Sequence, residues 1–456
     1  MKPAIRKIIF WAFLATFFIS APLVVLYTAG YRWNFSRFSL VKTGLLSITT
    51  FPKNATIFLD GKPQKTTPAI LENIMPGLHK VRLLKDGYLS WEKTLEIKEQ
   101  ETTFAPKVVL FSDQSTEIKE DINFSTAVFD ATGYRLGYVL GEQGWWEIWV
   151  KDLSNDEKKL LLRLPQKEIQ PLEITWSANG KNLFVKETTN EITQWQIVGA
   201  DGSKRFVVED ILKINGWKAL DKIIAITPDP FDDNIIYAQT EETVWLINLN
   251  ENRAKKLFDQ NLVVWQRGEL LLFLQPTESG VELTRQEKDT TQQVVAKIPV
   301  GNYRFLPAPP TLVLLQDVER HKIILVDDRG IDKPIYLEAA AFAAYWNPDN
   351  QKQLLYVSDF ELHIYDADRQ SDELLTRISS PITGVAWHPS GADILFSDNQ
   401  NLSAIELDKR GAGRNVFPLA GLETIGSFTI TNDSKKLFLC GEKNAVRGVF
   451  EKNLGW

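Results

Sequence analysis

The chain has 456 residues, of which 44% are apolar and 24% charged, so it has room for two or three domains and is neither disordered nor fibrous. The first 42 residues hold six Lys or Arg and no acidic residue, whereas the rest holds 46 basic and 58 acidic residues, a net charge of −12. Nucleic acid and anionic lipid would be repelled by such a body, and no basic stripe with interleaved aromatic residues offsets this charge. The single cysteine, Cys440, excludes an intramolecular disulfide framework, and its place in an apolar run indicates a small buried side chain.

The N-terminal segment from Ile8 to Ala29 contains no charged residue. As a helix, its 22 residues would be about 33 Å long, which is close to the thickness of a hydrocarbon core. A cleaved signal peptide is the alternative, but its apolar region is shorter and is followed by a small-residue cleavage site. We therefore expect residues 1–42 to hold an uncleaved transmembrane anchor spanning about 8–29 and a juxtamembrane segment.

The orientation of this span is set only weakly by charge. Three basic residues precede it and three follow it, so the positive-inside rule is nearly balanced (Lys2, Arg6 and Lys7; Arg32, Arg37 and Lys42). Because one long region follows a single N-terminal span, we expect the bulk of the chain to be extracytoplasmic, in the periplasm or at the cell surface.

Residues 43–111 alternate between short strand-like runs and turn signals, which predicts a small all-β domain. The turn residues include Asp60-Gly61, Gly77 and Gly87, and glycine adopts positive φ there without steric cost. The pattern resembles the PEGA domain, a small β-sandwich of prokaryotic surface and membrane-linked proteins. The resemblance rests on Pro52-Lys53-Asn54-Ala55 and, in the family's order, on "IFLDGK" (57–62), "TTPAIL" (66–71), "PGLHKVRL" (76–83) and "KDGYLSW" (85–91). It implies an envelope location with a spacer or adhesive role, and no catalytic residues.

Residues 112–456 repeat one phrase, in which a Pro, Asp or Gly turn leads into an apolar run. The eight phrases begin 38 to 51 residues apart, at Phe129, Trp176, Thr227, Trp265, Leu306, Trp346, Trp387 and Ile430. Self-similarity at about 40–45 residues with several strands per unit predicts a β-propeller, in which the residue before each turn acts as a wedge between blades.

The phrases at 176, 346 and 387 resemble the WD40-like repeats of the TolB family well, those at 129 and 430 partly, and those at 227, 265 and 306 weakly. The count fits eight blades, or seven with one degenerate unit. Because the last unit is short, we expect residues 107–119 to supply its outer strand and so to remove an exposed sheet edge. The predicted fold class is therefore all-β, with one N-terminal transmembrane helix.

Catalytic and metal-binding patterns are absent from the sequence. The four histidines, His79, His321, His363 and His388, lie in separate units, and His388 occupies a turn position that Asn347 fills in another repeat. The acidic turn of residues 227–234, with Asp229, Asp232 and Asp233, offers oxygen ligands for Ca²⁺ but lacks the spacing of a known calcium loop. We interpret it, and the turns at 327–330 and 366–369, as solvated turns. We therefore predict no catalytic, cofactor or metal residues.

The leading hypothesis is a membrane-anchored, non-catalytic scaffold of the prokaryotic envelope, whose propeller binds an envelope protein or a wall polymer and no nucleic acid. The alternative is a propeller enzyme, a lyase or hydrolase, in which His321, His363 and His388 would converge with acidic residues in the central channel. The sequence assigns neither the binding face nor the oligomeric state.

Overall fold

The computed structural model describes residues 3–34, 38–166, 172–189, 193–218, 221–229, 231–287 and 291–455. Lys2 and Arg37, two of the six charges that flank the predicted span, lie outside this part of the chain. The chain divides into two compact units. The small unit contains residues 1–114, 405–419 and 455–456, and the large unit contains residues 115–404 and 420–454.

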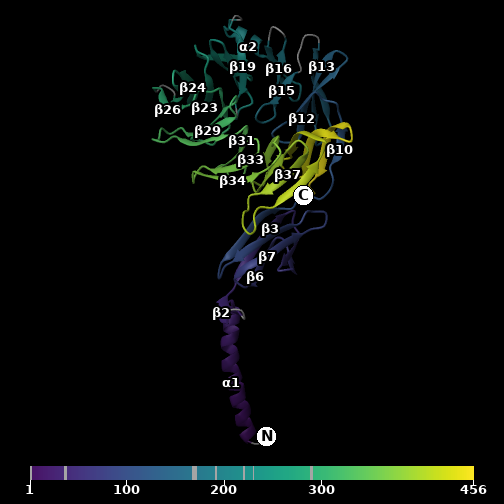
Figure 1. Ribbon diagram of the computed structural model, residues 1–456, viewed down its shortest axis with the longest axis vertical. Helices are drawn as coiled ribbons and strands as arrows, with labels where there is room; N and C mark the ends of the chain where they lie inside the picture. The colour runs from purple at the N-terminus through teal and green to yellow at the C-terminus, as the bar shows by residue number, and fades with distance from the viewer. Residues whose placement is uncertain are drawn as a thin grey trace. The chain divides into compact units, whose positions relative to one another are not determined.

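The N-terminal helix α1 (Pro3–Thr28) covers most of the predicted span. Its stretch from Arg6 to Thr28 is long and apolar enough to cross a membrane, and its side chains are exposed all around, including Trp11 at 64% and Phe13 at 73%. The hairpin of β1 (Tyr31–Asn34) and β2 (Ser39–Lys42) follows at once (Figure 1). Gly30, at φ +84°, turns the chain out of the helix, a conformation in which glycine is unstrained.

Residues 44–109 form two sheets. One sheet has the order β6–β3–β9, in which β3 (Gly44–Phe51) pairs antiparallel with β6 (Ala69–Ile74) and parallel with β9 (Thr102–Val109). The other has the order β5–β4–β7–β8, from β5 (Lys62–Thr66), β4 (Thr56–Leu59), β7 (Gly77–Leu84) and β8 (Trp91–Ile97). The core alternates as a half-buried sheet requires, with Trp91, Lys93, Leu95 and Ile97 of β8 buried and the residues between them more exposed. Asp60 and Gly61, both at positive φ, form the predicted hairpin turn.

Residues 117–453 form eight four-stranded sheets within the described chain, so the count of eight blades is confirmed over seven. Their strands in spatial order are β11 (Thr126–Phe129), β12 (Arg135–Glu142), β13 (Trp145–Asp152), β14 (Lys158–Pro165); β15 (Glu173–Trp176), β16 (Asn182–Thr188), β17 (Thr193–Gly199), β18 (Arg205–Val207); β19 (Ile223–Pro228), β20 (Ile235–Thr240), β21 (Val244–Asn248), β22 (Arg253–Phe258); β23 (Val263–Arg267), β24 (Leu270–Thr277), β25 (Gly280–Gln286), β26 (Gln293–Ile298); β27 (Tyr303–Leu306), β28 (Leu312–Asp317), β29 (Lys322–Asp327), β30 (Ile335–Ala340); β31 (Ala343–Trp346), β32 (Gln353–Val357), β33 (Glu361–Asp366), β34 (Ser371–Arg377); β35 (Gly384–Trp387), β36 (Asp393–Ser397), β37 (Asn401–Glu406), β38 (Val416–Gly421); and β10 (Glu117–Asp121), β41 (Val446–Asn453), β40 (Lys436–Lys443), β39 (Thr424–Ile430).

First strands of successive sheets contact one another at β11 and β15, β23 and β27, β31 and β35, and β35 and β39, and the contact of β39 with β11 closes the ring. The second strand of a sheet is covered on both faces by the neighbouring sheets. In β28, for example, every residue is buried. The short helix α2 (Val208–Ile214) is inserted after β18 and accounts for the longest interval between phrases.

The predicted closing strand needs a correction of its bounds. The outer strand of the last sheet is β10, which begins at Glu117 and pairs with Glu451 of β41, beside the yellow C-terminal strands of Figure 1. Residues 107–109 belong instead to β9, because the buried Val108 and Val109 pair with β3 and complete the small sandwich. Only the last three residues of the predicted segment 107–119 therefore take part in closure.

Three of the four tryptophans that begin a repeated phrase connect adjacent sheets by a hydrogen bond, as expected for wedge residues. Trp176, Trp346 and Trp387 each donate the indole N–H to a backbone carbonyl of the preceding repeat, namely those of Val128, Pro307 and Tyr345, at 2.9–3.0 Å. A buried indole N–H needs such a partner, so each wedge fixes its sheet to the neighbour by both packing and a hydrogen bond.

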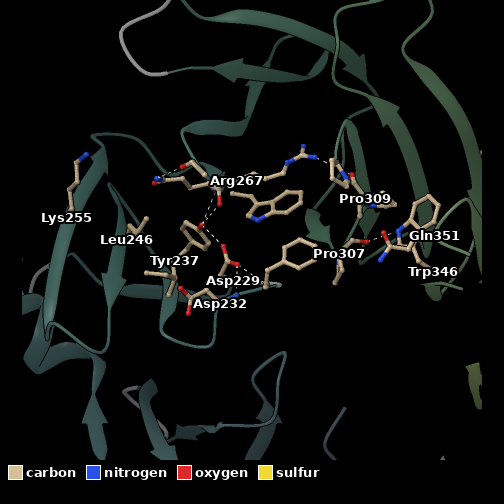
Figure 2. Close-up of a pocket in the computed structure, with 17 residues that line it drawn as sticks. Asp229, Asp232, Tyr237, Leu246, Lys255, Arg267, Pro307, Pro309, Trp346 and Gln351 are labelled. Atoms are coloured by element: carbon tan, nitrogen blue, oxygen red, sulfur yellow. Dashed lines mark hydrogen bonds between the residues drawn. The ribbon is translucent and has the colours of Figure 1, made fainter. Parts of the chain in front are cut away.

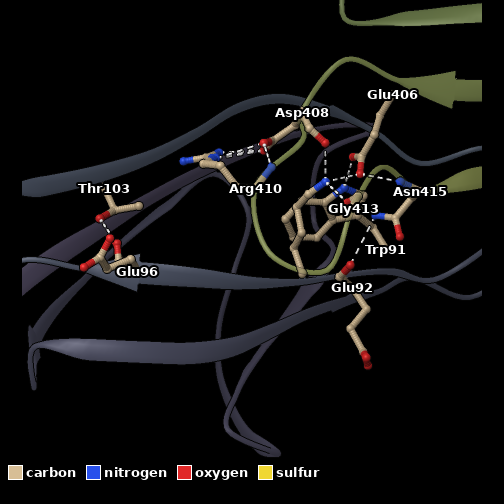
Figure 3. Close-up of polar contacts among 10 residues, drawn as sticks. Trp91, Glu92, Glu96, Thr103, Glu406, Asp408, Arg410, Gly413 and Asn415 are labelled. Carbon is tan, nitrogen blue, oxygen red and sulfur yellow. Dashed lines mark hydrogen bonds and ion pairs between the residues drawn. The ribbon is translucent and has the colours of Figure 1, made fainter. Parts of the chain in front are cut away.

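The small unit contains a buried ion pair that the sequence pattern did not reveal (Figure 3). Lys93 of β8 is 4% exposed, and its ammonium contacts the Glu406 carboxylate and the carbonyls of Asp408 and Gly413. Glu406 also accepts hydrogen bonds from the Trp91 indole and the Asn415 backbone N–H, both at 2.7 Å. All three ammonium donors and both carboxylate oxygens are thus satisfied, which a buried pair requires.

Candidate functional site

The main candidate site is a cavity of about 820 Å³, which we call the aromatic pocket. It lies where the turns between the first and second strands of four successive sheets meet, the sheets that begin with β19, β23, β27 and β31. Its lining residues are Asp229, Phe231, Asp232, Ile235, Tyr237, Leu246, Lys255, Trp265, Gln266, Arg267, Gly268, Pro307, Ala308, Pro309, Pro310, Trp346 and Gln351.

Trp265 is the centre of the aromatic wall. Its ring stacks on Phe231 with centroids 6.0 Å apart and packs at a tilt against Phe305 at 5.7 Å. The Arg267 guanidinium lies 4.9 Å from the ring centroid, within cation–π range. Because Trp265 is only 1% exposed while Phe231 is 56% exposed, Phe231 is the apolar surface that a ligand would meet.

Asp229 and Tyr237 form the polar floor of the pocket (Figure 2). Asp229 accepts hydrogen bonds from the backbone N–H groups of Phe231 and Asp232 and, at 2.9 Å, from the Tyr237 hydroxyl. The same hydroxyl accepts the Gln266 backbone N–H at 2.9 Å, which joins the sheets of β19 and β23. Burial and the adjacent Asp229 charge raise the pKa of Tyr237, so the hydroxyl stays a neutral hydrogen-bond donor.

Arg267 connects the pocket to the sheet of β27. Its guanidinium donates to Asp328 at 2.6 Å and, at longer range, to the carbonyls of Pro309 and Leu312. Burial lowers the pKa of Arg267, and the Asp328 carboxylate opposes this effect. Since Asp229, Tyr237 and Arg267 are all bonded within the protein, they form a rigid frame.

Two polar side chains at the rim differ from this frame. Lys255 and Gln351 are exposed and have no hydrogen-bond or ionic partner among the residues that the structure describes. Figure 2 shows them on opposite sides of the pocket. They are therefore available to a ligand, whereas the frame is occupied.

A second cavity of about 930 Å³, the lysine pocket, is lined by turns of the sheets that begin with β11, β15 and β19. Its charged lining residues are five basic and three acidic: Arg135, Lys158, Lys159, Lys181, Lys204, Asp152, Glu157 and Asp201. Lys158 pairs with Glu120, and Lys159 donates to the Asp201 carbonyl. Lys181 and Lys204 are exposed and have no such partner within the described chain.

The four histidines lie in different parts of the fold, and three of them have local partners. His79 contacts Asp60 and the Met75 carbonyl, both at 2.6 Å, in the small unit. His321 lies exposed in the turn between β28 and β29. His363 stacks on Tyr356 between Glu361 and Asp372 of its own sheet. His388 is fully buried, its Nδ1 lies 2.8 Å from the Ser390 hydroxyl, and burial lowers its pKa to about 3.

The turns at 227–234 and 327–330 are not the solvated turns that the sequence predicted, because Asp229, Asp233, Asp327 and Asp328 are buried. Hydrogen bonds hold all three acidic turns. Asp233 accepts the Asn179 backbone N–H at 2.9 Å, and Asp232 accepts two donors of Asn234. In the turn at 327–330, the Arg329 guanidinium lowers the pKa of Asp327 to about 2, and in the turn at 366–369 Asp366 accepts the Arg369 backbone N–H. Among the described residues, no group of three or more His, Cys, Asp or Glu side chains is arranged to hold a metal ion.

Sequence reasoning singled out Asp229 and Asp232 but missed the other residues of the aromatic pocket. One signal was available, because the three phrases that match the repeat weakly, at 227, 265 and 306, supply most of the lining. A repeat departs from its own pattern where its residues form a site instead of packing between sheets.

Comparison with known proteins agrees with this architecture. Residues 43–109 match the model of the PEGA domain, and no curated protein matches the chain. The C-terminal WD40 domain of Sif2 is similar in structure, with a TM-score of 0.50 and 12% identity, over 75% of this chain and 99% of that domain.

Two further solved structures are similar. A eukaryotic initiation factor has a TM-score of 0.48 and 12% identity, over 76% of this chain and 89% of that one. Oligogalacturonate lyase in complex with manganese has a TM-score of 0.41 and 11% identity, over 74% and 97%. At these identities the likenesses concern the fold alone. The chain thus consists of an N-terminal helix long and apolar enough to span a membrane, a PEGA domain and an eight-bladed β-propeller.

Proposed function

We propose that this protein is a membrane-anchored, extracytoplasmic binding protein of the prokaryotic cell envelope, and that its propeller holds a protein or a wall polymer at the aromatic pocket without catalysis. The observation that carries the proposal is how the pocket is built. Exposed Phe231 lies over a frame in which Tyr237 bonds to Asp229 and to the sheet of β23, and Arg267 bonds to the sheet of β27. Such a frame can recognise a ligand, but its carboxylate and guanidinium are not free to react with one.

The helix and the strands after it support anchoring rather than cleavage. The Gly30 carbonyl accepts hydrogen bonds from the backbone N–H and the hydroxyl of Thr43. Arg32 donates to the Tyr27 carbonyl at 2.7 Å and to Asn73 of β6 at 2.8 Å. Removal of residues 1–30 would abolish both bonds from Thr43 to Gly30 and the bond from Arg32 to Tyr27. The end of the helix is therefore part of the folded small unit.

The enzyme alternative finds its best support at His363, which lies within 3.4 Å of both Glu361 and Asp372. These residues line neither the aromatic pocket nor the lysine pocket. His321 lies in the turn between the second and third strands of its sheet and His388 in the turn between the first and second strands of another, which favours separate local roles over one shared site. The binding function is therefore the better-supported proposal.

Co-sedimentation tests the proposal with the full chain in lipid nanodiscs. Purified walls and envelope membranes are offered separately, and membranes are also offered after protease treatment. We expect saturable pelleting with one of these materials that Phe231→Ser weakens at least tenfold. Phe360→Ser is the matched control, because Phe360 is also partly exposed but lies in the turn between β32 and β33, at the other end of its sheet. Equal pelleting of both variants would contradict a role for the aromatic pocket.

A further inference from the structure

The aromatic pocket and the lysine pocket open at the same end of the propeller. Both are lined by turns that join first to second or third to fourth strands, and in an antiparallel sheet these turns lie at one end. The turn between β19 and β20 contributes to both, with Asp232 in the aromatic pocket and Asn234 in the lysine pocket. One extended ligand can therefore occupy the two cavities by crossing this turn.

We propose that this ligand is a segment of an acidic polypeptide, with an apolar side chain in the aromatic pocket and carboxylates at the lysine pocket. The inference rests on the proposed binding function and specifies its partner. It follows from two neighbouring cavities. One is apolar, and its polar side chains are bonded within the protein. The other contains Lys181 and Lys204, whose ammonium groups have no hydrogen-bond or ionic partner within the described chain.

The aromatic pocket favours an apolar group over a sugar ring. Sugars bind by stacking on exposed aromatic faces and by hydrogen bonds from many hydroxyls. Here Trp265 is covered by Phe231, Phe305 and Arg267, and the Asp229 carboxylate and the Tyr237 hydroxyl already have partners. What remains exposed is Phe231 with the neighbouring prolines, and an aromatic and proline surface is typical of protein-binding grooves.

The lysine pocket supplies charge complementarity. Lys181 and Lys204 lie in turns of the sheet that begins with β15, and Lys255 adds a third uncommitted ammonium at the rim of the aromatic pocket. These charges stand out in a chain whose residues beyond 42 carry a net charge of −12. Carboxylates close to an apolar anchor would meet them, whereas the acidic surface elsewhere repels carboxylates, so these lysines set where an acidic segment can bind.

The crossing between the pockets suits a peptide backbone better than a lipid chain. The shared turn exposes polar groups of Asp232 and Asn234, so a chain that lies across it must tolerate a polar surface. A peptide backbone has hydrogen-bonding groups along its whole length, whereas an acyl chain has none.

A selection experiment with the full chain in detergent tests this inference. A library of random twelve-residue peptides displayed on phage is selected on the immobilised protein, and enriched peptides are synthesised and measured by fluorescence anisotropy. We expect enriched peptides to combine an apolar residue with Asp or Glu. Their affinity should fall at least tenfold with Phe231→Ser and with the double change Lys181→Glu and Lys204→Glu, and it should also fall as salt rises.

The controls lie at the opposite end of the propeller. Phe360→Ser matches the apolar change, and Lys222→Glu with Lys443→Glu matches the charge reversal, because these lysines lie before β19 and at the end of β40. Peptides without acidic residues, or peptides insensitive to either pocket change, would overturn the inference, as would failure to enrich any peptide.

Dodecanoate, followed by tryptophan fluorescence, serves as the lipid probe. If it binds with dependence on Phe231 and both lysines while no peptide is enriched, the ligand class is a lipid and the peptide inference is wrong. Pelleting with envelope material that Phe231→Ser abolishes would still uphold the proposed function in that case, so the two failures are distinguishable.

Discussion

Lys93 and Glu406 lie 313 positions apart in the chain and form an ion pair in which both side chains are less than 10% exposed. Burying two charges is costly, and the cost is offset only when every donor and acceptor is satisfied. The pair meets this condition through Trp91, Asn415 and two backbone carbonyls. Residues 405–419 are therefore a structural part of the small unit and not a peripheral loop.

Neutralising one partner should destabilise the small unit. With Glu406→Gln, the Lys93 ammonium keeps its buried position but loses its counter-charge, so we expect a loss of about 3–5 kcal/mol in the free energy of unfolding. Urea titration of the full chain measures the loss. Lys93→Met combined with Glu406→Gln should cost less than the two single changes added together, because neither charge then remains unpaired.

The matched control for this pair lies on the same strand. Glu92 pairs with Lys80 at 2.7 Å, but both side chains are exposed, so Glu92→Gln should change the free energy of unfolding by less than about 1 kcal/mol. An equal effect of Glu406→Gln and Glu92→Gln would mean that the buried pair contributes no more than a surface pair.

His388 should make the protein sensitive to acid. Its pKa is about 3 when folded and 6.5 when exposed, so between these values the unfolded chain binds a proton that the folded chain does not. Stability therefore falls as the pH drops below 6.5, by about 2 kcal/mol at pH 5. His388→Asn should remove this dependence, because Asn347 fills the same turn position in a neighbouring repeat and accepts the corresponding backbone hydrogen bond.

Thermal unfolding at pH 7.5 and pH 5 measures the effect, with His321→Asn as a control at an exposed turn. The expected result is a smaller drop in Tm for His388→Asn than for the parent chain, with His321→Asn unchanged from the parent. If the parent and His388→Asn lose the same Tm, protonation of His388 does not drive the acid sensitivity.

Cys440 should be inert in the folded protein. The thiol is 2% exposed, and burial raises its pKa to about 12, so almost no thiolate is present at neutral pH. We expect a thiol reagent to modify it promptly in concentrated urea and only at the rate of unfolding in native buffer. Mass spectrometry measures the modification, and fast modification of the native chain would contradict the buried position of the Cys440 thiol.

The N-terminal helix should remain on the mature protein. Apolar side chains are exposed all around α1, as a helix in contact with lipid requires, and Gly30 and Arg32 just after it are bonded to Thr43 and Asn73. The intact mass of protein extracted from membranes should therefore include residues 1–30, and the protein should resist an alkaline carbonate wash. A soluble form that begins near residue 30 would show that the segment is a signal peptide instead.

The fold was predictable because its determinants are local and repeated. The phrase around Trp176, Trp346 and Trp387 encodes a wedge, a turn and a buried strand within a dozen residues, so eight copies suffice to indicate eight sheets. The sequence pattern does not indicate β5, β6 and α2, because these segments are short or have largely exposed side chains, and apolar periodicity does not detect such segments.

The candidate site was less predictable, because its residues meet only in space. Tyr237 and Gln266, or Arg267 and Asp328, come from neighbouring sheets, and no spacing within one repeat encodes their contact. The same holds for Lys93 and Glu406. A search for departures from the repeat, rather than for motifs, would have found Trp265 and the prolines of the phrase at 306.

The pairing of β10 with β41 has a consequence for how the protein is made. β10 leaves the ribosome before any other strand of the propeller, yet Glu117 has no partner until Glu451 has been translated. Throughout synthesis the sheet that begins with β11 lacks the last sheet beside it. The backbone groups of β10 are unpaired during this time and can bind the wrong strand. A chain shortened by its last dozen residues would keep most of its blades and still lack the strand that pairs with β10.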